Sequence, residues 1–187
     1  MRKALFAQGS MLAVMMAVGI SASAQQAERL KAEEMTAIRS AVSKAGPVSF
    51  WVVTEDFTGS FESIRANGEK VKADELKQNV GASMGSFQPH GILILLEDPT
   101  GKQQFRMSLG FTVPSRVKVG APLKVEQIKY DKAVRYTHVG QYQQLANVYH
   151  GMNDVKGLKF PVVLRLVDDP TTVPAEWIRT ELIAALK

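Results

Sequence analysis

The last segment of the chain places one acidic residue beside an apolar run. Glu181 directly precedes Leu182-Ile183-Ala184-Ala185-Leu186. In a strand, alternation puts Glu181 on the face opposite Leu182 and Leu186. Two roles are open to such a carboxylate. It can pair with Arg179 or a lysine on a solvent face, or it can act as a counter-charge within a pocket, where surrounding aromatic rings help to attract a delocalised cation.

Two other patterns could indicate a catalytic serine or a metal site, but the sequence context argues against both. Gly81-Ala82-Ser83-Met84-Gly85 has the spacing of a nucleophile elbow. An elbow needs a strand before the serine and a helix after it, whereas this segment follows a charged helical stretch and enters a loop, so we expect no active serine. The three histidines, His90, His138 and His150, form no His-x-x-x-His pair and cysteine is absent. We therefore expect no metal site.

The sequence elements around Glu181 occur twice. Leu96-Glu97-Asp98-Pro99-Thr100 returns as Val167-Asp168-Asp169-Pro170-Thr171, each time after an apolar run. Upstream, Gly59-Ser60-Phe61-Glu62-Ser63-Ile64 has its counterpart in Gly140-Gln141-Tyr142-Gln143-Gln144-Leu145. Two motifs repeated in the same order predict a duplicated unit. Two such units would leave a cleft at their seam, where small ligands bind favourably.

The chain begins with the pattern of a secretory signal peptide over residues 1–24. Arg2 and Lys3 precede an apolar stretch that closes with Ser21-Ala22-Ser23-Ala24. The run from Met11 to Ile20 is too short to span a bilayer, which disfavours a retained anchor. Removing 24 of the 187 residues leaves 163, a suitable length for one domain. We therefore expect a periplasmic or secreted protein with no membrane contact after cleavage.

Charge also disfavours nucleic acid as a partner. The leader holds two positive charges, so its removal lowers the net charge from +5 to +3. Lys70, Lys72 and Lys77 lie among acidic residues of the same segment, which is typical of a solvated helix face. The expected partner is a small molecule, and the sequence predicts no oligomeric state.

Hydrophobic spacing predicts an α+β fold. In the first half it indicates an N-terminal helix in residues 25–46, a strand at 50–53, helical structure from 61 to 78, and strands at 92–96 and 105–113. In the second half it indicates a hairpin of strands 123–130 and 133–137 turning near Asp131, a helix from Tyr142 to Met152, and strands at 161–166 and 178–186. We interpret these elements as two pseudo-symmetric β-α-β-β repeats, residues 47–114 and 121–187, which form an antiparallel sheet with the helices packed outside.

Three motifs of the second half resemble the GyrI-like effector-binding domain, a family related to the SOUL haem-binding fold. They are His138-x-Gly140-x-Tyr142-x-x-Leu145, Leu166-x-Asp168-Asp169-Pro170 and Arg179-Thr180-Glu181-Leu182. Gln141 and Ala185 stand where the family pattern has prolines. No axial-ligand motif indicates haem, and we expect no cofactor.

The resemblance implies that residues 47–187 form one GyrI-like domain and that Glu181 points into an aromatic pocket that receives cationic or amphipathic molecules. The other residues expected at this pocket are Tyr142, His138, Trp177, Tyr149, Phe111 and Trp51. The preferred interpretation is an exported small-molecule-binding module that is not an enzyme. Two alternatives stay open: a hydrolase of strained electrophiles with Glu181 as general base, and a ligand-free interaction protein of the cell envelope.

Overall fold

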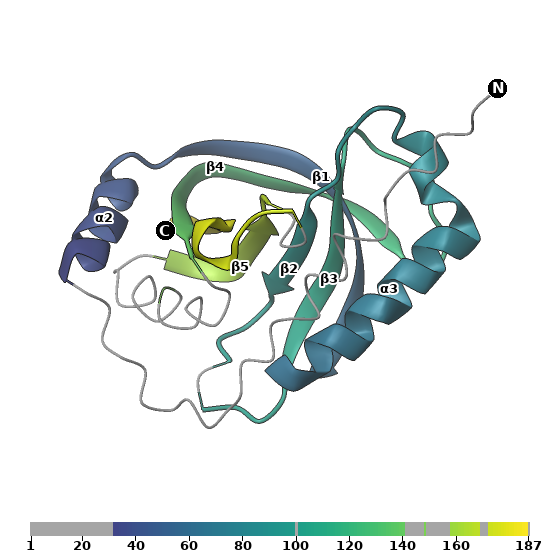
Figure 1. The fold of residues 1–187 in the computed structure, drawn as a ribbon, viewed down its shortest axis with the longest axis horizontal. Coiled ribbons are helices and arrows are strands. Elements are labelled where there is room, and N and C mark those ends of the chain that lie inside the picture. Colours follow the sequence, from purple (N-terminus) through teal and green to yellow (C-terminus); the bar gives the residue numbers. More distant parts are fainter. Residues whose placement is uncertain (1–31, 100, 141–147, 149–157, 169–171, 187) are drawn as a thin grey trace.

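The computed structural model describes residues 32–99, 101–140, 148, 158–168 and 172–186. Six antiparallel strands close into a barrel in the order β1-β3-β2-β5-β6-β4 (Figure 1). The elements are α2 (Ala32–Ser43), β1 (Gly46–Gly59), a 3-10 turn (Phe61–Ser63), α3 (Ile64–Gln78), a second turn (Val80–Ser83), β2 (Gly91–Leu95), β3 (Phe105–Val113), β4 (Lys124–Val139), β5 (Leu158–Leu166), a third turn (Ala175–Trp177) and β6 (Arg179–Leu186). The predicted α+β class with an antiparallel sheet is confirmed, and closure into a barrel is an additional finding.

Two layers of apolar side chains hold the barrel together. Neighbouring residues of a strand point to opposite faces, so Val53 joins the outer layer and Val52 the inner one. The outer layer packs beneath the helices and includes Ile38 of α2 and Val71 of α3, both fully buried. The described members of the inner layer all lie on strands or directly beside them: Val48, Phe50, Val52, Ile92, Ile94, Leu96, Ile128, Tyr130, Ala133, Val163 and Ile183.

The helices cover different parts of the outer face. Figure 1 shows α3 beside β1 and β3, whereas α2 lies near β4. Helix α3 ends at Asn79, whose φ of 51° places it in the left-handed region and whose N–H donates to the carbonyls of Glu75 and Leu76. Helix α2 lies within the N-terminal helix that the sequence predicts, and Ile38 anchors it in the outer layer.

The hairpin predicted around Asp131 is wrong, because β4 is one continuous strand. Its first part pairs with β1, from Thr54↔Lys124 to Val48↔Tyr130, and its later part pairs with β6. Between these parts the register with β1 shifts by one residue. Such a bulge breaks the two-residue alternation of side chains, and this break resembles a turn in the sequence.

Strand pairing follows the same scheme in both halves. β3 pairs with β1 and β2, and β6 pairs with β4 and β5. The backbone N–H of Arg106 donates to Glu97 Oε1 at 3.2 Å, and that of Arg179 donates to Asp168 Oδ2 at 2.9 Å. Most of the predicted helix of the second repeat lies outside the described residues, although Val148 is helical and buried. The internal duplication therefore stays a prediction, as does the signal peptide, which also lies outside them.

We predict that Gly110→Ala destabilises the barrel. A Cβ at Gly110 would overlap the backbone carbonyl oxygen of Val53 and lie 2.8 Å from Thr54 Cα, on the strand that pairs with it. Relief requires β1 and β3 to separate, so we expect a loss of about 1–3 kcal/mol in the free energy of unfolding, measured with urea. Gly46→Ala is the control because its Cβ would meet no atom within 4 Å. Equal stability of the two variants would contradict the close approach.

Candidate functional site

Glu181 lies on the inner face of the barrel wall and is enclosed by arginines. It has the same alternation as Ile183 of the inner layer, and the residue is only 8% exposed. Its Oε2 is 2.5 Å from Arg165 Nη2 on β5, and its Oε1 is 3.8 Å from Arg135 Nη1 on β4. The carboxylate thus already has its counter-charges from the two neighbouring strands, and it is not the solvent-face residue of the simplest interpretation.

The cluster around Glu181 extends along the inner face. The Arg165 guanidinium lies 5.7 Å from the centroid of the Phe50 ring, a cation–π distance. Burial lowers the pKa of the His90 imidazole, and the charge of Arg165 lowers it further, so His90 stays neutral near pH 7. Because His90 is neutral, the negative charge of Glu181 is compensated mainly by Arg165.

The first half has a different polar group at the matching position. Ser108 follows Arg106 by two residues, as Glu181 follows Arg179, and it is fully buried and donates to Asp56 Oδ1 at 2.5 Å. Burial alone would raise the pKa of Asp56, but hydrogen bonds from Lys124 and Ser108 outweigh this effect and hold the pKa below its ordinary value. In each half, therefore, a carboxylate on the inner face is paired with a basic side chain.

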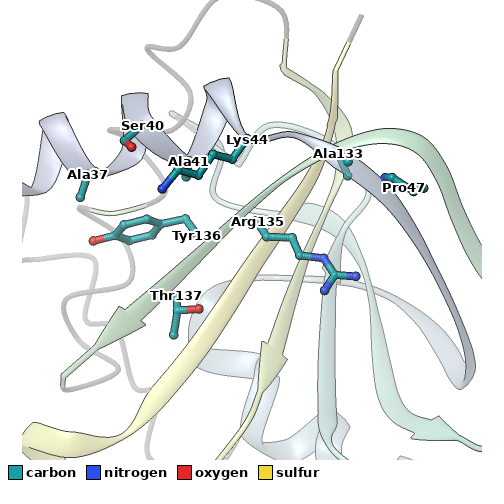
Figure 2. A pocket seen from close by; sticks show the side chains of 10 residues that line it. Ala37, Ser40, Ala41, Lys44, Pro47, Ala133, Arg135, Tyr136 and Thr137 are labelled. Carbon is teal, nitrogen blue, oxygen red and sulfur yellow. The ribbon is translucent and has the colours of Figure 1, made fainter.

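The structure has a cavity of about 470 Å³ between α2 and β4. Figure 2 shows its walls: α2 on one side, the start of β1 at one end, and β4 on the other side. The lining residues are Ala37, Ser40, Ala41, Lys44, Gly46, Pro47, Ala133, Arg135, Tyr136 and Thr137. Pairing of β1 with β4 ends at Ala133, and beyond this residue α2 faces β4 in place of a strand. The small side chains of Ala37, Ser40 and Ala41 on α2 leave the space open.

The charged groups that line this cavity are basic. Lys44 extends from the end of α2, and Arg135 extends from β4 in a direction different from that of Tyr136, whose ring lies beneath α2 (Figure 2). Burial raises the pKa of Tyr136, so its hydroxyl remains a neutral hydrogen-bond donor at neutral pH. No aspartate or glutamate is among the ten lining residues. The cavity therefore offers two cations, a phenol and an apolar floor.

The described residues expected at the Glu181 pocket do not line the α2–β4 cavity, and that pocket stays a prediction. His138 is 2% exposed and faces α2, with its Nδ1 3.5 Å from Glu34 Oε1. Phe111 is buried in the outer layer and Trp51 packs against that layer, while Trp177 is 67% exposed. None of these side chains lines the cavity, and neither does Glu181 itself. The remaining expected wall residues, Tyr142 and Tyr149, lie outside the described residues.

The residues that sequence reasoning missed are the basic ones. Arg165 alternates with Val163 and Arg135 with Ala133, so both are charged residues at inward positions of predicted strands. A charged residue at an inward strand position is the same sequence signal that singles out Glu181. Lys44 carried no such signal, because it lies at the exposed end of an amphipathic helix.

Three further observations concern metal binding, a nucleophilic serine and membrane-spanning helices. Within the described ranges, no group of three or more histidine or acidic side chains could hold a metal ion. Ser83 lies in the turn that follows α3, and no strand directly precedes it, so the context expected of a nucleophile elbow is missing. Among all the residues that the structure describes, no helix has both the length and the apolar character needed to cross a membrane.

No protein-family model matches this sequence, and no curated protein matches it. Solved structures do match its fold. The C-terminal domain of EcmrR has a TM-score of 0.62 at 15% identity, covering 76% of this chain and 95% of that domain. A hydrolase from Listeria innocua has a TM-score of 0.51 at 12% identity, covering 76% and 92%. EcmrR in a complex with DNA gives 0.55 at 15% identity, covering 76% of this chain and 57% of that one.

These matches establish that this chain shares the fold of the EcmrR C-terminal domain. The fold implied by the sequence resemblance is thus supported, while membership of the GyrI-like family stays a prediction. The expectation that this chain does not bind nucleic acid also stays a prediction, since one matching structure comes from a DNA complex.

We predict that Glu181→Gln destabilises the protein at neutral pH. The amide cannot balance Arg165, which would retain a mostly buried, uncompensated positive charge. We expect a loss of about 1–3 kcal/mol in the free energy of unfolding. Glu97→Gln is the control, because Glu97 also contacts two basic side chains, Lys102 and Arg106, but at the surface. A Glu181→Gln variant no less stable than the control would show that the inner ion pair contributes nothing.

Proposed function

We propose that this chain is a small-molecule-binding module that binds its ligand in the cavity between α2 and β4. The observation that carries the proposal is the cavity itself, which has the volume of a ligand site, an apolar floor and a few polar groups. The chain also shares its fold with the C-terminal domain of EcmrR, a protein whose complex with DNA is known. The duplicated β-α-β-β unit is part of the proposal and would explain why the antiparallel pairings of the two halves correspond.

Glu181 is poorly suited to act as the counter-charge of a cationic ligand or as a general base. A cationic ligand would have to displace Arg165 from the carboxylate, at the cost of leaving that guanidinium without its counter-charge. A general base must reach a substrate or water, whereas Glu181 is 8% exposed and faces two arginines. We therefore assign Glu181 to positioning Arg135 at the cavity wall and place the hydrolase alternative second, since no described feature favours it.

Filling the cavity tests its role directly. Ala37 lines the cavity from α2, and leucine keeps a high helix propensity while adding three carbon atoms there. We expect Ala37→Leu to weaken binding of any ligand found by a titration screen at least tenfold, with an unchanged melting temperature. Arg39→Leu, at an exposed position of the same helix, is the control. Full binding by Ala37→Leu would place the ligand elsewhere.

Export is a separate part of the proposal. Ala22 and Ala24 fit the small subsites of a signal peptidase, so the exported protein should begin at Gln25. Intact-mass spectrometry of the protein recovered from an exporting bacterial host will show this. A membrane-associated species that retains residues 1–24 would contradict cleavage and favour an anchored protein.

A further inference from the structure

We propose that the ligand of the α2–β4 cavity is an anionic amphipathic molecule, an aromatic or aliphatic body that carries a carboxylate. This inference rests on the proposed function and names its ligand class. It reverses the sign of charge that the sequence indicates for the ligand. The reason is that the charges facing the cavity are those of Lys44 and Arg135, both positive.

The acidic groups nearest to the cavity are engaged elsewhere. Glu181 has its closest contact with Arg165, at 2.5 Å, while Arg135 is 3.8 Å away. Glu34 of α2 lies near His138, with 3.5 Å between its Oε1 and Nδ1. Neither carboxylate lines the cavity. The charge of Glu34 also acts on the Tyr136 hydroxyl, so it moderates the positive field from outside the cavity lining.

Arg135 keeps donors available for a ligand. Its side chain is 49% exposed, and the 3.8 Å separation from Glu181 exceeds hydrogen-bonding distance. A guanidinium presents five N–H donors in a planar fork that matches the two oxygens of a carboxylate. The single 3.8 Å contact with Glu181 therefore leaves most of these donors available.

The other lining groups suit the rest of such a molecule. Lys44 supplies a second, flexible positive charge from the end of α2, and the Tyr136 hydroxyl supplies a neutral donor. Ala37, Ala41, Pro47 and Ala133 form apolar walls with little bulk. An apolar body would displace water from these walls while the carboxylate binds the basic groups, which is the usual division of labour in small-ligand sites.

Three probes with one aromatic body test the ligand class: 2-naphthoate, neutral 2-naphthamide and (2-naphthylmethyl)trimethylammonium. We expect calorimetric titration of the mature protein to show binding of 2-naphthoate at least tenfold tighter than of the amide, and no measurable binding of the ammonium compound. Raising the salt concentration should weaken only the naphthoate, because ions screen the charge contact.

Two variants test whether the basic residues of the cavity wall cause the preference for 2-naphthoate. Arg135→Gln and Lys44→Gln should each weaken 2-naphthoate binding by on the order of tenfold and leave 2-naphthamide unchanged, since each removes one charged contact. Arg116→Gln and Lys118→Gln, at exposed positions outside the cavity lining, are the matched controls. Because Arg135→Gln also removes a neighbour of Glu181, its stability is checked by thermal unfolding. Lys44→Gln tests the charge preference without altering the surroundings of Glu181.

The outcomes separate the ligand class from the site. If Ala37→Leu abolishes binding of all three probes but the ammonium compound binds the parent protein best, the cavity is the site and the anionic class is wrong. If 2-naphthoate binds and neither Ala37→Leu nor the charge variants affect it, the proposed site itself is wrong. Equal affinities for the naphthoate and the amide would also overturn the inference.

Discussion

A carboxylate buried in the wall of the barrel requires a counter-charge, and much of the surrounding arrangement depends on this constraint. Glu181 on β6 obtains its counter-charge from Arg165 on β5, with Arg135 on β4 as a second, looser neighbour. The three residues lie on three adjacent strands, so the ion pairs connect the second half of the barrel across its inner face. Leaving either charge alone at such a site would cost more than the pair itself contributes.

The same constraint links the barrel interior to the cavity. Arg135 belongs to the inner face by alternation, yet it is also one of the residues that line the cavity between α2 and β4. This is feasible because pairing with β1 stops at Ala133, so the wall beyond it is formed by β4 and a helix rather than by two strands. Through Arg135, the ion-pair cluster thereby contributes one of the two positive charges that line the cavity. A role for Glu181 as the direct counter-charge of a ligand would require this cluster to be rearranged.

The sequence predicted the elements of the fold well where the hydrophobic period was regular. Strands β2, β3, β5 and β6 and helix α3 lie within a few residues of their expected positions, because each has an uninterrupted pattern bounded by glycine, proline or a polar residue. The hairpin near Asp131 failed because a bulge and a turn interrupt alternation in the same way. Closure of the barrel depends on pairings between β1 and β4 and between β2 and β5, which are far apart in the chain and leave no local signal.

The candidate site was harder to predict than the fold. Glu181 was identified as unusual from its position in an apolar strand, but its partners come from two other strands whose register was unknown. His138 and Phe111 were assigned to a pocket through a family resemblance, and the structure places them in the packed outer face. The cavity depends on small side chains of α2 lying opposite β4, and alanines in an amphipathic helix are equally compatible with close packing.

The most direct test of the central ion pair is a double-mutant cycle of Glu181→Gln and Arg165→Gln, followed by urea unfolding at neutral pH. A coupling free energy of about 1–3 kcal/mol is expected, with the double variant more stable than the sum of the single losses predicts, because the second change removes the charge that the first left unbalanced. Losses that add within about 0.5 kcal/mol would show that the two residues are energetically independent. In that case Glu181 would again be available as the counter-charge of a cationic ligand.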